Sequence, residues 1–523
     1  MGRTRRFWLE WLAAFAVCAA ICAAYQYQTP FLGEEDSYYH IKFAWLLRHH
    51  GLFRSGFPWT QFSLWRDGFS DGSIVFHLFL IPFTFGDLMA GGKAATLVLS
   101  AFTLSSFFAI LTLNKVRDRL YWFWVFLLGG GFFWWRMMVL RPQVLSAALL
   151  LWSIHFLING NRKRFAAMSF LYPLSYVAAF LPQVFSVVRW AYLKVVERRD
   201  ERGILLAGLG AYALATLLHP YFPKNLTFFY VQNFYVMFLA MTSKVNLYLA
   251  GEFLPLDTRQ IVGAHAVLIA HLVGIFFVFM HRRTPLSERT RLMFPIALIV
   301  VLLTCGSKRF VEYSIPVTTL FCAFLFEDVF AGYGPEDFRR DYGKPGMAFA
   351  FAWLIAMGAA SGSEANIVYN DFSRINPPRF KELAAVLAAK APPGEMIYTC
   401  DWDETPELLF YNHQHQYPVL MDPTFMYYWN PQIWQSWFDV ANGKLDADET
   451  VETLTGTFHA RYGLCGGKFT ALRRLIREDK RFTILAENRN GYVFQLSAAP
   501  RMTGIKVTIP PNAVHEHPHA ATN

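Results

Sequence analysis

Long apolar segments alternate with short clusters of basic residues along most of this sequence, and no other feature limits the fold so strongly. A segment of about twenty apolar residues is long enough to cross a bilayer as a helix. Only 16% of the residues are charged, compared with about 25% in an average soluble domain. The pattern therefore predicts a polytopic α-helical membrane protein. Because the basic residues form no continuous face, the net charge of +10 does not lead us to expect nucleic acid as a partner.

The basic clusters also predict an orientation, because short cytoplasmic loops of membrane proteins are rich in Lys and Arg. The first apolar segment follows Arg3, Arg5 and Arg6, which places the N-terminus in the cytoplasm and favours an uncleaved anchor. Following the remaining clusters along the chain gives about eleven crossings and an external C-terminal region. This assignment requires residues 73–90 to form a helix that lies at the outer interface and does not cross. We therefore expect a multi-pass protein of a bacterial inner membrane with a periplasmic C-terminus.

A change of composition near residue 362 predicts how the chain is divided into domains. Residues 1–361 are expected to form the transmembrane domain, with a first external loop at 26–93. Residues 362–500 alternate helix-like and strand-like patterns, which predicts an external α/β domain. Residues 501–523 have the composition of a disordered tail.

Individual patterns within the external region predict its elements. The stretches "RFKELAAVLAAK" and "FTALRRLIRED" are typical of helices, "EMIYTCDWD" and "YPVLMDP" of short buried strands, and "FTILAENRNGYVFQL" of a hairpin. Cys400 and Cys465 are the cysteines that lie outside the apolar segments. Both lie in expected strands, whose ends often meet at one edge of a sheet, and an oxidising periplasm permits a bond. We predict a disulfide between them, with two separately buried thiols as the alternative.

Three consecutive carboxylates, Glu34, Glu35 and Asp36, follow the first apolar segment on the expected outer side. In a wet loop such a cluster is normally just solvated. Basic and aromatic residues are expected in the same layer here, including Arg141 near two tryptophans and Arg309 in "SKRFVEYSIP". Both arginines lie on the side that basic residues avoid, which favours a function for them.

A lipid-linked phosphate sugar would account for this combination of groups. Its apolar chain stays in the bilayer, so its site needs arginines at membrane depth for the phosphate and a carboxylate just above them. Arg309, Arg141 and His219 fit the phosphate role, because guanidinium groups bind phosphate bidentately and stabilise the charge of a leaving group. Asp36 would be the general base that deprotonates or orients the acceptor. The alternative for the arginines is snorkelling to the outer headgroups.

The stretch "GEEDSYYHIKFAWLLRHHG" resembles the first external loop of GT-C superfamily membrane glycosyltransferases, which use polyprenyl-phosphate or polyprenyl-diphosphate sugars. Oligosaccharyltransferase catalytic subunits have an Asp followed by an aromatic-rich helix that ends in Gly. The matching residues here are Asp36, Tyr38, Tyr39, Ala44 and Gly51. The resemblance assigns the catalytic acid to Asp36, with Glu35 as its neighbour or substitute. The interfacial helix and the polytopic body followed by an external domain also resemble this superfamily.

Two further motifs of oligosaccharyltransferases have partial or no counterparts in this chain. "CDWDETPELLFY" is similar to their Trp-Trp-Asp acceptor-binding motif, which gives Trp402 and Asp403 an acceptor-binding role, although the tryptophan is not doubled. Their second acidic metal-binding motif is replaced by "RMMVLRPQVLS", which contains no carboxylate. Glu252 is a remote candidate ligand, and a solvated or ion-paired Glu is its alternative role. The sequence therefore leaves the metal and any other cofactor unknown.

These features together predict a GT-C-like glycosyltransferase with about eleven spans and a C-terminal external α/β domain. It would transfer a sugar from a polyprenyl-phosphate-linked donor to an acceptor on the outer side of the membrane. Its partners would be the lipid-linked sugar donor, membrane lipids and an acceptor that the sequence does not identify.

Two other classes of protein stay open. A non-catalytic assembly or scaffold protein of the same shape would not need Asp36 and Arg309 around one shared cavity. A transporter would have ionisable or broken segments near the bilayer midplane. The expected spans contain few ionisable residues beyond His155, His265, His271 and Glu327.

Overall fold

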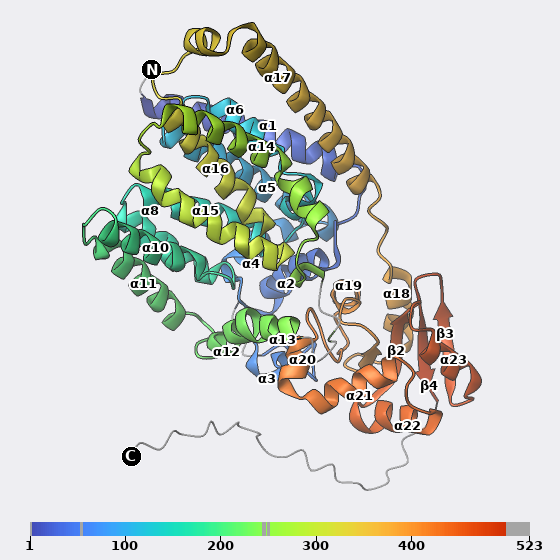
Figure 1. Ribbon diagram of the computed structural model, residues 1–523. Coiled ribbons are helices and arrows are strands. Elements are labelled where there is room, and N and C mark those ends of the chain that lie inside the picture. The colour runs from blue at the N-terminus through green and yellow to red at the C-terminus, as the bar shows by residue number, and fades with distance from the viewer. Residues whose placement is uncertain (1–2, 53–55, 243–246, 248–250, 498–523) are drawn as a thin grey trace, which may run out of the picture.

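The computed structural model describes residues 3–52, 56–242, 247 and 251–497. Over these residues the chain forms a large helical body, which is followed by a smaller C-terminal region of helices and one sheet (Figure 1). This combination agrees with the predicted helical part and C-terminal α/β part. The expected tail at 501–523 lies outside the described residues.

Six helices in the described part of the chain are long and apolar enough to cross a membrane. They are α1 (Arg3–Gln26), α5 (Leu88–Leu113), α14 (Thr258–Arg282), α15 (Glu288–Gly306), α16 (Val311–Val329) and α17 (Pro335–Ser373). The helices α7 (Gly131–Met137) and α8 (Pro142–Ile158) are bent against each other by 101° and would count as a seventh span if taken together.

The expected number of about eleven crossings is not confirmed, because several apolar segments form helices that are too short. These helices are α6 (Arg119–Leu127), α9 (Arg162–Leu171), α10 (Leu181–Val195) and α11 (Arg202–Leu217). The longest of them, α11, has 16 residues. At about 1.5 Å per residue it reaches ~24 Å, whereas the hydrocarbon core of a bilayer is about 30 Å thick.

The segment 73–90, which was expected to lie at the interface, also forms no long helix. Before α5 begins at Leu88, its helical part is α4 (Ile74–Leu80), which continues into the 3₁₀ turn η1 (Ile81–Thr84). Together these two elements extend over ~18 Å. The segment is therefore too short to cross a bilayer, as the interfacial assignment requires.

The remaining helices of the body are short, and most of them gather at the end that faces the C-terminal region (Figure 1). They are α2 (Glu35–His50), α3 (Trp65–Gly68), η2 (Tyr172–Leu174), α12 (Lys224–Tyr230), the π-helical turn η3 (Val231–Tyr235), α13 (Val236–Thr242), η4 (Gly251–Phe253) and η5 (Lys308–Phe310). The helix α2 contains the acidic and aromatic stretch of the first loop.

The helix α17 links the helical body to the C-terminal region and runs along the side of the body (Figure 1). It has 39 residues and is interrupted at Gly343, whose φ of 57° is a backbone conformation that favours glycine. The expected domain boundary at 361/362 falls inside this helix, which continues to Ser373.

One four-stranded sheet forms the centre of the C-terminal region. The strands β1 (Met396–Thr399), β2 (Ala460–Gly466), β3 (Phe482–Glu487) and β4 (Gly491–Leu496) are arranged in the order β1-β2-β4-β3. β1 is parallel to β2, whereas β4 is antiparallel to both of its neighbours. The surrounding helices are α18 (Lys381–Lys390), α19 (Thr405–Tyr411), α20 (Thr424–Trp429), α21 (Pro431–Ala441), α22 (Ala447–Glu452), the π-helical turn η6 (Thr453–Thr457) and α23 (Thr470–Glu478). The predicted strand "EMIYTCDWD", the hairpin and the two predicted helices are confirmed.

The prediction of a strand in "YPVLMDP" is wrong. This segment forms no strand of the sheet, and its backbone bonds to the first loop instead. The backbone N of Tyr417 donates to the carbonyl of Trp59 at 2.8 Å, and that of Phe62 donates to the carbonyl of Pro418 at 3.2 Å. Its apolar character has another cause, since Leu420 is buried in a cluster with residues of α2 and the first loop.

The C-terminal region is held against the helical body by apolar packing around α2. One buried cluster contains Tyr39 and Phe43 from α2, Trp65 from α3, and Leu409 and Phe425 from the C-terminal region. The helix α19 also packs against α2. The two parts of the protein therefore meet at the helix that carries the acidic stretch.

Candidate active site

A cavity of about 150 Å³ lies where the helical body meets the C-terminal region. Its wall includes several residues singled out in the sequence, namely Asp36, Tyr39, Arg141, Glu252, Arg309 and Trp402. Asp36 comes from α2, Arg141 from the bend between α7 and α8, Arg309 from η5 and Trp402 from the loop after β1. The fold thus brings together groups from four distant parts of the sequence.

Arg141 is placed at the cavity by the sharp bend between α7 and α8. It is the N-cap residue of α8, with an extended backbone, and Pro142 begins the helix. Its guanidinium forms ion pairs with Glu34 and Asp36, and its Nη1 donates to Oε2 of Glu252 at 2.9 Å. One cation is therefore surrounded by three carboxylates.

Asp36 lies in the first turn of α2, beside this cation. Burial raises the pKa of Asp36 to about 6, although Arg141 opposes the shift, and the carboxylate of Glu252 adds to it. Burial likewise raises the pKa of Glu34 to about 7 against the effect of Arg141. With this shift the carboxylate of Asp36 is a stronger base than an ordinary aspartate and is still largely ionised at neutral pH.

The pKa of Glu252 is shifted in the opposite direction, because arginines surround this carboxylate. Burial alone would raise its pKa, but Arg141, Arg136 and Arg309 outweigh that effect and hold the pKa of Glu252 well below its usual range. Glu252 is ion-paired with Arg136, and its Oε1 lies 3.9 Å from Nη2 of Arg309. Its position in η4 therefore connects the arginines of three separate elements.

Arg136 is fixed on its other side by a buried carboxylate of α16. Its Nε and Nη2 donate to the two carboxylate oxygens of Glu312, each at 3.1 Å. Glu312 is completely buried. This bidentate pair leaves Arg136 no free direction toward the cavity, so we regard it as part of the framework of the site.

Arg309 keeps unused hydrogen-bonding capacity at the cavity wall. Its Nη2 donates to the hydroxyl of Tyr176 at 3.3 Å, and its guanidinium lies over the ring of Phe253 at 4.6 Å. Its Nε is buried and has no hydrogen-bond partner among the residues that the structure describes. Because a guanidinium has five N–H donors, this arrangement can still bind an anion.

Glu35 and Asp403 do not line this cavity. Nη2 of Arg379 lies 3.3 Å from Glu35 and 3.7 Å from Asp403, so one arginine bridges the start of α2 and the C-terminal region. Burial and the neighbouring Asp401 raise the pKa of Asp403 to about 6, with Arg379 opposing them. Glu35 faces a separate cavity of about 440 Å³.

His219 lines a neighbouring cavity of about 140 Å³, which shares Tyr176, Val177 and Phe228 with the first one. Its Nδ1 accepts a hydrogen bond from the backbone N of Tyr221 at 3.2 Å. Burial lowers the pKa of His219, which favours the neutral ring. The proton of that neutral ring therefore lies on Nε2.

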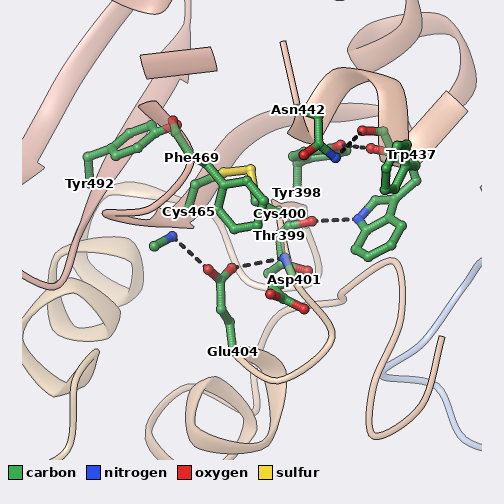
Figure 2. Close-up of a disulfide and its surroundings, with 12 residues drawn as sticks. Tyr398, Thr399, Cys400, Asp401, Glu404, Trp437, Asn442, Cys465, Phe469 and Tyr492 are labelled. Atoms are coloured by element: carbon green, nitrogen blue, oxygen red, sulfur yellow. Dashed lines mark hydrogen bonds between the residues drawn. A yellow bond between two sulfur atoms is a disulfide. The ribbon is translucent and has the colours of Figure 1, made fainter. Parts of the chain in front are cut away.

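The position of Trp402 is fixed by the predicted disulfide, which the structure confirms. Cys400 and Cys465 are bonded, with their Cα atoms 5.0 Å apart (Figure 2). Glu404 accepts hydrogen bonds from the backbone N of Gly466 at 2.6 Å and of Asp401 at 3.2 Å. The turn that carries Trp402 is thus bound to the end of β2 by covalent and hydrogen bonds.

Several residues of the cavity wall were not recognised in the sequence. They include Asp71, His77, His40 and Asp422. Asp71 lies in the first loop, and His77 lies in the segment 73–90, which was expected only to lie at the interface. The spacing of Asp36 and His40, which are four residues apart on one helix, was the signal that could have linked His40 to the site.

The residues around Asp36 do not match a metal site. Within the described part of the chain, no group of three or more His, Cys, Asp or Glu side chains is arranged to hold a metal ion. The nearby carboxylates Glu34, Asp36 and Glu252 all contact the guanidinium of Arg141 instead. Arg141 therefore provides the positive charge that these carboxylates require.

Solved structures with the same fold exist, although no protein-family model and no curated protein sequence matches this chain. The oligosaccharyltransferase AglB from Archaeoglobus fulgidus, in complex with an inhibitory peptide and a dolichol-phosphate, superposes with a TM-score of 0.62. That match has 13% identity and covers 91% of this chain and 72% of AglB. ArnT from Cupriavidus metallidurans, bound to undecaprenyl phosphate, gives a TM-score of 0.54 at 14% identity, over 93% of this chain and 98% of ArnT.

A third similar structure is the arabinofuranosyltransferase AftD from Mycobacteria. Its TM-score is 0.57 at 13% identity, and the match covers 95% of this chain but only 40% of AftD. At these identities the similarity establishes the fold alone. The chain therefore has a GT-C-like fold, as the resemblance of its first loop implied.

Proposed function

We propose that this chain is a membrane glycosyltransferase that transfers a sugar from a polyprenyl-phosphate-linked donor to an acceptor on the outer side of the membrane. The observation that carries the proposal is the shared cavity, whose wall holds Asp36, Arg141 and Arg309. The reaction needs both kinds of group, because the acceptor has to lose a proton and a phosphate has to leave with its charge.

Two of the similar structures support the class of donor. ArnT is bound to undecaprenyl phosphate, and AglB is in complex with a dolichol-phosphate, so both bind a polyprenyl phosphate. A donor of this class would keep its hydrocarbon chain among the apolar helices and place its phosphate at the cavity. Membrane lipids would then surround the body of the protein.

Arg309 is the principal phosphate-binding residue in this proposal, because its Nε is unpartnered among the described residues and its other face is supported by Phe253. Arg141 adds positive charge from the opposite side of Glu252. His219 lines the neighbouring cavity and is the third candidate for contact with the phosphate; its ring also hydrogen-bonds the backbone of Asp71, so it would have to exchange that contact for one to the donor. These donors would stabilise the negative charge of the departing phosphate.

Asp36 would accept a hydrogen bond from the attacking group of the acceptor and thereby orient and activate it. Its raised pKa makes it suited to this role at neutral pH. Trp402 offers an aromatic surface for the acceptor at the same cavity. Glu35 and Asp403 would position the acceptor side of the site through Arg379, which connects them.

The alternatives differ from this proposal in what they require. A scaffold has no need for a general base and a phosphate-binding arginine on one cavity wall, so the shared cavity favours an enzyme. A transporter would use ionisable groups within its long helices to bind or move its substrate. His265 is bonded to Ser314 and His271 to Tyr121, which is typical of packed helices.

The proposed location is a bacterial inner membrane, with the N-terminus in the cytoplasm and the C-terminal region in the periplasm. A topology reporter fused after Gly160 should then be active only as a cytoplasmic marker, and one fused after Gly362 only as a periplasmic marker. The opposite activity at both positions would invert the orientation and place the cavity on the wrong side for the proposed reaction.

The function is tested by a transfer assay with purified protein in lipid nanodiscs. Polyprenyl-phosphate sugars that differ only in the sugar are offered together with glycan, lipid and peptide acceptors, and released polyprenyl phosphate is measured. We expect release that depends on both the donor sugar and the acceptor. If no combination releases polyprenyl phosphate above the level of empty nanodiscs, the proposed function fails.

A further inference from the structure

Three side chains outside the Asp36–Arg141 pair form a hydrogen-bonded chain at the wall of the same cavity. Nδ1 of His77 lies 2.8 Å from Oδ2 of Asp71, and Nε2 of His77 lies 2.9 Å from Nδ1 of His40. All three residues are buried and line the cavity. The chain connects the loop before α4, α4 itself and α2.

When both rings are neutral, the order of these contacts determines where the protons lie. The carboxylate of Asp71 accepts hydrogen bonds, one of them from the backbone N of Ser73 at 2.9 Å. A neutral His77 must therefore carry its proton on Nδ1, facing Asp71, and accept at Nε2. His40 then donates from Nδ1, and its own Nε2 is left without a proton.

Nε2 of His40 is available as a proton acceptor at the cavity. Within the described part of the chain, the hydrogen bond of the His40 side chain is the one to His77 through Nδ1. Burial, His77 and Arg141 lower the pKa of His40 well below its usual range, so the ring is neutral at pH 7. A neutral ring of known tautomer has one basic nitrogen.

His40 is also close to the proposed reaction centre. Asp36 and His40 are four residues apart on α2, so their side chains are neighbours on one face of the helix. Both line the cavity that Arg309 and Trp402 complete. A group that is oriented by Asp36 would thus have a second base within reach.

We propose that His40 is a further catalytic residue, which takes the proton of the attacking acceptor group on Nε2, and that His77 and Asp71 are positioning residues that hold the required tautomer. This inference rests on the proposed glycosyl transfer. In that reaction the acceptor forms a bond to the anomeric carbon of the sugar, and the bond from that carbon to the phosphate oxygen breaks. The phosphate keeps the electron pair, and the acceptor proton moves to His40.

The proton leaves His40 after the transfer and passes to the released phosphate or to water, so the site returns to its starting state. Throughout, Nδ1–H of His40 keeps its hydrogen bond to His77, which Asp71 holds in place. This arrangement follows the general logic of a base whose orientation is fixed by a third group.

The first test compares two buried histidines in the transfer assay. In His40→Gln we expect kcat to fall about a hundredfold, as for the loss of a general base, while the donor KM stays within about twofold of wild type. The matched control is His155→Gln on α8, since His155 is also buried and is bonded to Asn114 at 2.9 Å, away from the cavity. The control should keep the wild-type kcat.

The second test separates a catalytic role from a structural one. Added imidazole should restore transfer by His40→Ala, and the restored rate should increase with pH as imidazole loses its proton. Asp71→Asn should lower kcat without a change in donor KM, because an amide can donate to Nδ1 of His77 and reverse the tautomer. If His40→Ala does not fold, Asp71→Asn still tests the inference, because it leaves His40 in place and changes only the tautomer.

Two results would overturn this inference and leave the proposed function intact. One is a wild-type enzyme that transfers sugar while His40→Gln has the same kcat as His155→Gln. The other is a folded His40→Ala that binds donor normally and gains no activity from imidazole. A wild-type protein without any transfer would instead contradict the proposed function itself.

Discussion

The guanidinium of Arg141 is paired with the carboxylate of Asp36, although the helices α3 to α7 lie between these two residues in the sequence. The same guanidinium contacts Glu34 and Glu252, so Asp36 belongs to a buried cluster and is not an isolated carboxylate of a wet loop. Charges taken out of water need such partners. The start of α2 is thereby fixed at the cavity.

Removing the charge of Arg141 should destabilise the protein. In Arg141→Gln, three carboxylates lose their shared cation, and breaking a buried ion pair costs on the order of 3 kcal/mol. We expect a clearly lower thermal midpoint in a melting experiment in detergent. Arg141→Lys should recover only part of the loss, because an ammonium group cannot reproduce the planar fork.

The control for Arg141 is Arg199→Gln. Arg199 is also paired with two carboxylates, Glu201 and Glu288, but these three side chains are 41–46% exposed. Solvent-exposed ion pairs contribute little to stability, so Arg199→Gln should lose no more than about 1 kcal/mol of unfolding free energy. Its thermal midpoint should therefore change only slightly. Equal midpoints for Arg141→Gln and Arg199→Gln would show that the buried cluster has no special importance.

Arg309 should affect the use of the donor. Arg309→Ala removes the buried Nε that has no partner among the described residues, and we expect the donor KM to increase about tenfold or more. Arg309→Lys should be partly competent, since it keeps the charge but not the bidentate geometry. Arg340→Ala, on the exposed start of α17, is a suitable control. A normal donor KM in Arg309→Ala would contradict the phosphate role.

The pH dependence of transfer should report the environment of Asp36. Burial raises the pKa of Asp36 to about 6, Arg141 opposes this, and the nearby carboxylates Glu252, Glu35 and Asp422 add to it. The reaction requires the ionised carboxylate, so kcat/KM should fall as the pH decreases through about 6 and be constant above that range. An acid limb at about 4, the value of an ordinary aspartate, would contradict the proposed environment.

The disulfide should matter for the acceptor side of the site. Cys400 and Cys465 are separated by 65 residues, and a loop of this length corresponds to about 4 kcal/mol of stabilisation in the chain-entropy account. Cys400→Ser with Cys465→Ser should therefore lower the unfolding midpoint of the C-terminal region and raise the acceptor KM through Trp402. Two free thiols by mass spectrometry of unreduced wild-type protein would disprove the bond.

The fold could be predicted from the sequence where a segment is long and apolar, as for α1, α5, α14, α15 and α16. The number of crossings could not, because hydropathy does not reveal where a helix ends or bends. The clearest example is the 101° bend between α7 and α8, which divides an apolar stretch and places Arg141 at the cavity. The predicted strand "YPVLMDP" failed for a related reason, since burial against the first loop produces the same apolar pattern as a strand.

The site could be predicted in part. The sequence shows that charged residues lie on the expected outer side, but it does not show in which direction each side chain points from its helix. Glu35 and Asp36 are adjacent in α2, so their side chains point about 100° apart. Asp36 lines the cavity and Glu35 faces Arg379. The chain from Asp71 to His40 depends entirely on tertiary packing, and no local motif indicates it.

The most direct test of the whole account is the transfer rate of Asp36→Asn, measured with a defined polyprenyl-phosphate sugar and an accepted acceptor. The substitution keeps the size of the side chain and removes its charge and basicity, so we expect a decrease of about a hundredfold or more in a protein that still folds. Asp67→Asn, at an exposed carboxylate of α3 that is paired with Arg66, should retain the wild-type rate. An Asp36→Asn protein as fast as Asp67→Asn would contradict the central claim that this cavity is the active site.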